Sequence, residues 1–131
     1  MRRTKEGKRA GGKYVCKKFK NILHIFCPVY TRNFYVIAGV PNSKFLKIAK
    51  KELGVDFNPS GSDGKFYVIK RSGQEVGVIW SEDKTIHLMH ELLHATFWVM
   101  ESAGIELTRA SEEAFTYYQS YLYRLIKSEG L

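Results

Sequence analysis

The sequence predicts an α+β domain in which helices pack on a small, mostly antiparallel sheet. Four short segments are rich in the aromatic and β-branched residues that favour strands, and three longer segments carry apolar residues at helical spacing. In chain order they read β-β-α-β-β-α-α, which is typical of an antiparallel sheet with helices packed on it. The length of 131 residues and the hydrophobic content of 44% allow one domain with a modest core.

The four strands are predicted as two consecutive pairs. Residues 21–27 and 33–39 form the first pair, and the short connection between them is consistent with antiparallel neighbours. Residues 65–71 and 75–80 form the second pair, and the intervening residues 72–74 carry the glycine of a hairpin turn.

The three helices have recognisable start and stop residues. The predicted bounds are Pro41 to Gly54, Ser81 to Gly104, and Thr108 or Ser111 to Lys127. Ser81 suits an N-cap, and Glu82 and Asp83 after it suit the positive end of the helix dipole. The second helix is apolar nearly all round, so we expect it to be buried.

The excess positive charge lies at the N-terminus. The formal net charge is +8, and the first 20 residues hold nine of the 21 Lys and Arg residues but one of the 13 acidic residues. Residues 1–12 are therefore predicted to be a flexible basic arm, and residues 13–131 a single domain. The arm could contact nucleic acid weakly, or it could be a solvated tail.

The sequence predicts a cytoplasmic protein with no membrane contact. It has no secretory signal and no apolar stretch of transmembrane length. Its two cysteines, Cys16 and Cys27, are then expected to be reduced, and their spacing does not indicate a second metal site. Cys27 lies in an apolar run and is predicted to fill the core.

One motif in the second helix carries chemistry. His90 and His94 frame an H-E-x-x-H sequence, and positions four apart lie one above the other on a helix face. Both imidazoles can therefore bind one Zn²⁺ ion, while Glu91 lies beside them as a candidate general base. Alternatively, the histidines could be ordinary core or surface residues paired with the backbone or with Glu91. His87, one turn earlier, could lie near the metal but is more simply a residue that faces solvent or contacts a metal ligand.

The spacing after this motif resembles that of the gluzincin metallopeptidases. His94 is followed by eighteen residues and then by Glu113 in the sequence E-A-F-T-Y-Y, much as in enzymes of the aminopeptidase N and thermolysin type. The resemblance covers about forty residues, from Thr85 to Leu125, and extends more weakly to small H-E-x-x-H proteins of tailed phages. It implies that Glu113 is the third zinc ligand, with Glu112 as the alternative one position away.

The resemblance also implies a minimal zincin-like fold and a peptide or protein substrate. Zincins often place an edge strand beside the metal helix, and residues 76–80 are the strand predicted for that role, unless this strand is paired on both sides. Tyr118 occupies the position of a tyrosine that stabilises an oxyanion in related enzymes. Thr96, two residues after the second histidine, departs from the apolar residue usual there.

The predicted function is that of a zinc-dependent metallopeptidase. His90, His94 and Glu113 would bind the metal, and Glu91 would take a proton from a zinc-activated water molecule. The alternative belongs to another class. It is a non-catalytic, metal-stabilised binding module whose basic N-terminal arm engages nucleic acid or a host protein.

Overall fold

The computed structural model of the chain describes residues 5–6, 9–10, 13–14, 16–19, 22–27, 30–56, 58–59 and 61–130. Its strands are β1 (Lys5–Glu6), β2 (Arg9–Ala10), β3 (Lys13–Tyr14), β4 (Cys16–Phe19), β5 (Ile22–Cys27), β6 (Arg32–Ala38), β7 (Gly64–Arg71) and β8 (Gln74–Ser81). Its helices are α1 (Asn42–Ile48), which continues as the π-helical turn η1 (Ala49–Leu53), then α2 (Ile86–Ser102) and α3 (Glu112–Ser128). Each of the predicted helices and strands is present.

The main sheet has the strand order β1-β4-β5-β6-β8-β7, and β2 pairs with β3 separately. All pairs in the main sheet are antiparallel except β6 with β8, which is parallel. The β7–β8 hairpin closes with a two-residue turn, because Arg71 pairs with Gln74 and both Ser72 and Gly73 have positive φ angles. The predicted α+β class with a mostly antiparallel sheet is confirmed.

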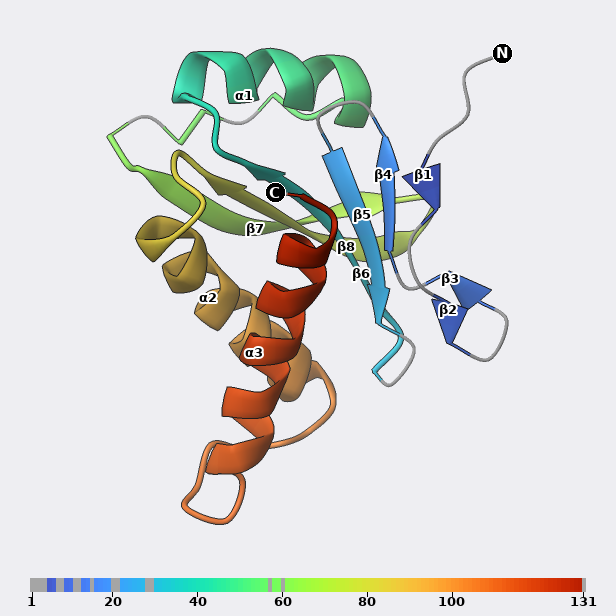
Figure 1. The fold of residues 1–131 in the computed structure, drawn as a ribbon, viewed down its shortest axis with the longest axis vertical. Coiled ribbons are helices and arrows are strands. Elements are labelled where there is room, and N and C mark those ends of the chain that lie inside the picture. The colour runs from blue at the N-terminus through green and yellow to red at the C-terminus, as the bar shows by residue number, and fades with distance from the viewer. Residues whose placement is uncertain are drawn as a thin grey trace.

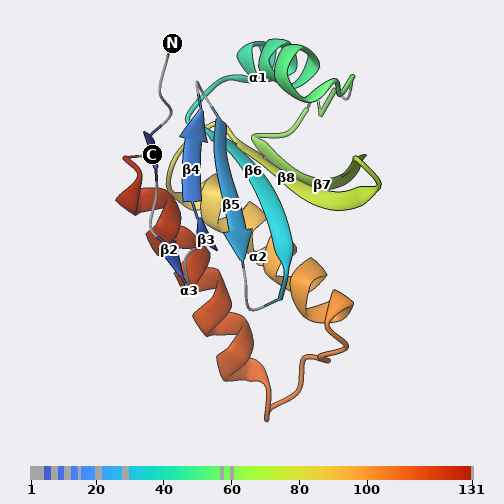
Figure 2. The same cartoon turned by 90° about the vertical axis from the view of Figure 1, so that its right-hand side faces the viewer.

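Helices cover both faces of the sheet (Figure 1). On one face, α2 and α3 pack against alternate residues of the central strands, such as Leu23, Phe34 and Ile79. On the other face, α1 and η1 pack against the intervening residues, such as Ile37 and Trp80. The alternation follows from the strand period of two, which sends successive side chains to opposite faces. The loop between α2 and α3 lies at the opposite end of the molecule from α1 (Figure 2).

The predicted edge strand is an interior strand. β8 lies between β6 and β7, and its last six residues are all buried. Such a continuous buried run is typical of a central strand covered on both faces, whereas β7 has several exposed residues and is the last strand of the sheet. The prediction that residues 76–80 form the open edge was therefore wrong, and the edge beside α2 is β7.

The N-terminal region contains strands that the sequence did not indicate. β4 pairs with β5, although Lys17 and Lys18 made it resemble the charged arm. Within residues 1–12, the four described residues belong to β1 and β2, and the rest of the predicted arm lies outside the described residues. Cys27 is buried, as predicted. None of the described helices is long and apolar enough to cross a membrane.

Candidate metal and catalytic site

His90 and His94 face each other on the exposed side of α2. Their Nε2 atoms are 3.3 Å apart, and their rings are inclined by 72° with centroids 4.9 Å apart. Two nitrogens that each lie about 2.05 Å from one tetrahedral zinc ion are separated by about 3.3 Å. The two nitrogens are within hydrogen-bond distance of each other, and the same separation suits two ligands of one shared ion; both side chains are open to solvent.

Glu91 is turned inward from the two histidines. It is only 7% exposed, and Leu92 beside it is fully buried, whereas His90 and His94 are exposed. Its carboxylate lies against the start of β7, where the backbone N–H of Phe66 donates a hydrogen bond to it. Burial raises the pKa of Glu91, and the nearby positive charge of His90, His94 and Lys65 opposes that rise only in part. A carboxylate of raised pKa is a stronger base.

Gly64 provides the space for this carboxylate. A Cβ atom at this position would lie 3.2 Å from Oε2 of Glu91 and 3.0 Å from the carbonyl oxygen of Trp80. The absence of a side chain thus lets the first residue of β7 approach the helix closely, which is one of the uses of glycine in a strand. The sequence contained a signal for this role, a glycine that directly precedes a strand, but its partner could not be inferred.

The three motif residues open into a shared cavity of about 270 Å³ between α2 and β7. Its lining residues are Ser62, Gly64, Lys65, Phe66, His90, Glu91 and His94. The cavity is therefore bordered by the first three residues of β7, the last strand of the sheet. An extended chain that paired with this edge would pass the histidines and the Glu91 carboxylate.

The predicted third ligand does not join the histidines. Glu113 and its alternative Glu112 are both exposed in the first turn of α3, where acidic side chains are favoured by the helix dipole. In the described part of the chain, no group of three or more His, Cys, Asp or Glu residues could hold a metal ion. The donors present fit zinc as two ligands of the three that a catalytic zinc site usually takes from the protein.

Tyr118 does not lie at the cavity. It is buried beside Cys27, Tyr30 and Tyr121, and burial raises the pKa of its hydroxyl well above the ordinary value. The predicted role in stabilising an oxyanion is therefore corrected. The apolar stripe of α3 runs through Phe115, Tyr118 and Leu122, so Tyr118 points into the core rather than toward the histidines.

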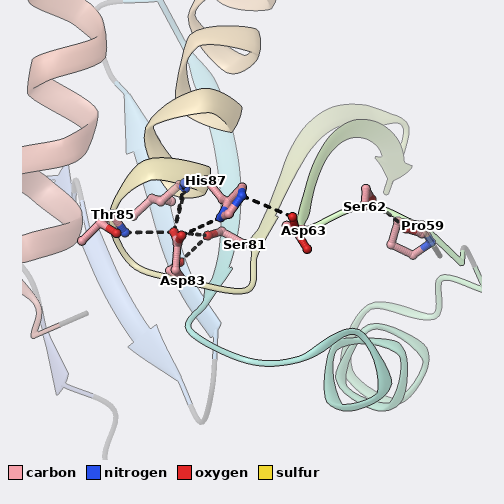
Figure 3. Close-up of polar contacts among 8 residues, drawn as sticks. Pro59, Ser62, Asp63, Ser81, Asp83, Thr85 and His87 are labelled. Carbon is pink, nitrogen blue, oxygen red and sulfur yellow. Dashed lines mark hydrogen bonds and ion pairs between the residues drawn. The ribbon is translucent and has the colours of Figure 1, made fainter.

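His87 belongs to a separate polar cluster at the start of α2 (Figure 3). Its Nδ1 lies 2.6 Å from Oδ2 of Asp83, and its Nε2 lies 3.3 Å from Oδ2 of Asp63. Oδ1 of Asp83 accepts hydrogen bonds from the backbone N–H groups of Thr85, His87 and Leu88. Asp83 therefore caps the helix. Ser81, the predicted N-cap, is a buried strand residue whose hydroxyl donates to the carbonyl oxygen of Asp83.

Thr96 has a structural explanation within the helix. Its hydroxyl is buried and donates to the carbonyl oxygen of Leu92 at 2.8 Å. The hydrogen-bond capacity of this polar side chain is thus met inside the helix, so it can take an interior position where the gluzincin pattern has an apolar residue.

Comparisons with known proteins add no relative. No family model, no curated protein and no solved structure matches the chain. The gluzincin resemblance therefore rests on the motif and on the spacing to Glu113 alone.

Proposed function

We propose that the protein is a zinc-dependent metallopeptidase whose reaction centre is formed by His90, Glu91 and His94. The observation that carries the proposal is the 3.3 Å separation of the two Nε2 atoms. It coincides with the spacing expected for two ligands of one tetrahedral zinc ion. A buried carboxylate lies beside them in a cavity that opens to solvent. Burial of a carboxylate costs free energy that nearby groups offset only in part, and a catalytic role would account for this cost.

The proposed roles follow from position. Zinc, when bound, lowers the pKa of a water molecule and polarises a substrate carbonyl. His90 and His94 would supply two ligands, and Glu113 is proposed as the third on the basis of spacing alone, since it does not lie with the histidines in this structure. Glu91 accepts the proton of the attacking water at its carboxylate and returns it to the leaving amine. The backbone N–H of Phe66 lies close enough to this carboxylate to lower its pKa.

Substrate orientation is proposed to come from β7. This strand has a partner on one side only, so its other edge can form backbone hydrogen bonds with an extended peptide. Because Gly64 to Phe66 line the cavity, a peptide on this edge would place one of its carbonyl groups near the histidines. Backbone pairing with β7 would thus bind peptides of different sequence and still fix which peptide bond lies at the histidines.

The test is a paired measurement of zinc content and peptide hydrolysis. We expect purified protein to contain about one zinc ion per chain and to cleave casein or a quenched peptide library, with activity lost on chelation and restored by Zn²⁺. A chain that holds one zinc per molecule but cleaves nothing in the library would overturn the peptidase proposal.

One observation favours a second candidate, a metal-stabilised binding module. No third ligand accompanies the histidines in the described residues, and a site without turnover would need no complete catalytic ligand set. In that case the basic residues near the N-terminus are proposed to contact nucleic acid or a host protein. Glu91 separates the candidates, because a binding module has no need of a general base and Glu91→Gln should leave its binding unchanged.

A further inference from the structure

A larger cavity continues from the histidine site toward the loop between α2 and α3. It has a volume of about 920 Å³, and it shares Phe66 and His94 with the smaller cavity at Glu91. Its lining residues are Phe66, His94, Phe97, Trp98, Glu101, Gly104, Ile105, Glu106, Leu107 and Phe115. The larger cavity is therefore adjacent to the histidine site, and we call it the distal cleft.

The walls of the distal cleft are aromatic. The rings of Phe97 and Phe115 contact each other with centroids 5.6 Å apart, and those of Phe66 and Trp98 are 5.7 Å apart. Phe97 is 39% exposed and Leu107 is 55% exposed, so apolar surface remains accessible within the cleft. Such a surface favours the binding of a ligand that has a long apolar stem or a planar group able to stack on aromatic rings.

Two carboxylates accompany this apolar surface. Glu101 lies in the last turn of α2 and Glu106 in the following loop, and both are exposed. Among the described residues neither forms an ion pair, and of the lining residues only His94 can carry positive charge. The cleft therefore combines aromatic walls with unneutralised negative charge, which is complementary to a cation on a partly apolar stem.

We infer that the distal cleft selects peptides with an arginine close to the scissile bond. This inference rests on the proposed peptidase function. Arginine matches the cleft in three respects: its methylene stem packs on apolar surface, its planar guanidinium stacks on rings, and its N–H groups pair with carboxylates. The chain shows the same chemistry in its own side chains, because the guanidinium of Arg32 lies 4.8 Å from the Trp98 ring centroid and 3.7 Å from Glu75.

The experiment measures binding separately from cleavage. Fluorescein-labelled heptapeptides that differ only in a central Arg, norleucine or Glu are titrated against zinc-supplemented Glu91→Gln protein by fluorescence anisotropy. We expect the Arg peptide to bind about fivefold or more tightly than the norleucine peptide, and the Glu peptide to bind most weakly, because exposed ion pairs are each worth up to about fivefold. Equal affinities for the three peptides would overturn the inference.

Variants then locate the preference. In Glu101→Gln/Glu106→Gln, made in the same background, the Arg and norleucine affinities should come within about twofold of each other. The matched control is Asp56→Asn/Glu82→Gln, which removes the same charge at two exposed positions outside the cleft and should keep the preference. If both variants lost the preference for the Arg peptide, that preference would come from the overall charge of the protein, and the inference would be overturned.

A cleavage assay of wild-type protein on the same peptides keeps the two proposals apart. Failure to cleave any peptide, with the Arg preference in binding intact, would refute the peptidase and leave the cleft as a binding site for arginine. Cleavage of all three peptides at equal rates, with equal binding, would refute the cleft and leave the peptidase standing.

Discussion

Two polar clusters lie one turn apart on α2, and their environments differ in kind. At the start of the helix, His87 has a carboxylate on each ring nitrogen, from Asp83 and Asp63. One turn later, the rings of His90 and His94 are hydrogen-bond partners of each other, and Glu91 is buried beside them near the backbone N–H of Phe66. Both ring nitrogens of the first cluster's histidine face carboxylates, whereas the second cluster opens into a cavity.

The difference indicates what each cluster does for the molecule. Asp83 and His87 join the helix N-terminus to the start of β7 and satisfy backbone donors, so they should contribute to stability. Burial of the Glu91 carboxylate is a cost to stability that no lysine or arginine contact in the described residues fully offsets. Removal of a group should therefore reduce stability in the first cluster and function in the second.

The largest expected effect is that of Glu91→Gln on hydrolysis. This change keeps the shape of the side chain and removes its basicity, so the cleavage rate should fall by a factor of roughly 100 or more. Thermal unfolding should occur at the same or a higher temperature, because a buried charge has been removed. Chelated wild-type protein gives the blank, and full activity in the variant would rule out Glu91 as the base.

Zinc content should separate the two clusters next. His94→Ala removes one of two facing nitrogens and should leave little bound zinc after dialysis, while His87→Ala should retain about one ion per chain. Metal analysis of the two purified variants makes the comparison. Equal zinc loss in both would mean that His87 is a ligand and that the clusters act as one site.

The third ligand can be tested at the start of α3. Glu113→Ala should lower the zinc content, whereas Glu112→Ala should not, because the spacing to His94 predicts Glu113. Both side chains are exposed, so neither change should unfold the protein. If both variants kept all of their zinc, the third ligand would not come from this helix turn.

A smaller effect is expected on stability from the helix cap. Asp83→Ala removes the acceptor of three backbone N–H groups and should lower the free energy of unfolding by about 1–2 kcal/mol. Chemical denaturation measures this change, and Glu82→Gln, which removes a neighbouring exposed charge, serves as the control. An unchanged unfolding midpoint would show that the cap hydrogen bonds contribute nothing.

The smallest expected effect is a pH dependence from His87. Its hydrogen bond to Asp83, followed by the charges of Asp83 and Asp63, raises the pKa of His87, although its desolvation opposes this. The resulting stability is fully present below the ordinary pKa of histidine, about 6.5, and is lost as pH rises through the raised value. The melting-temperature difference between wild type and His87→Gln should therefore be larger at pH 6 than at pH 9, and a constant difference would contradict it.

The acidic side of this pair titrates in the opposite direction. Desolvation of Asp83 tends to raise its pKa, but the N–H of Thr85, the His87 ring and the N–H of Leu88 together lower it. Its contribution is present above the ordinary aspartate range and is lost as pH falls through the lowered value. The contact between Asp83 and His87 should therefore stabilise the fold most at weakly acidic pH, above the ordinary pKa of aspartate and below the ordinary pKa of histidine.

Local patterns in the sequence determined the elements and the histidine pair. Period-two and helical spacings predicted four strands and three helices, and the four-residue spacing of His90 and His94 on a helix predicted their approach. These features depend on neighbours within a few residues along the chain, so no knowledge of the fold was needed. The buried position of Glu91 also followed in part, because its helix is apolar nearly all round.

Only the tertiary structure decided what surrounds that pair. Strand order placed β7 rather than β8 at the edge, and it brought Gly64 and Phe66 against Glu91 across more than twenty residues of chain. Packing of α3 turned Tyr118 into the core and left Glu113 exposed. Such contacts depend on which strands pair, in which register, and on how each helix is rotated about its axis. One local pattern is compatible with many strand orders and registers, so periodicity and spacing could not predict these contacts.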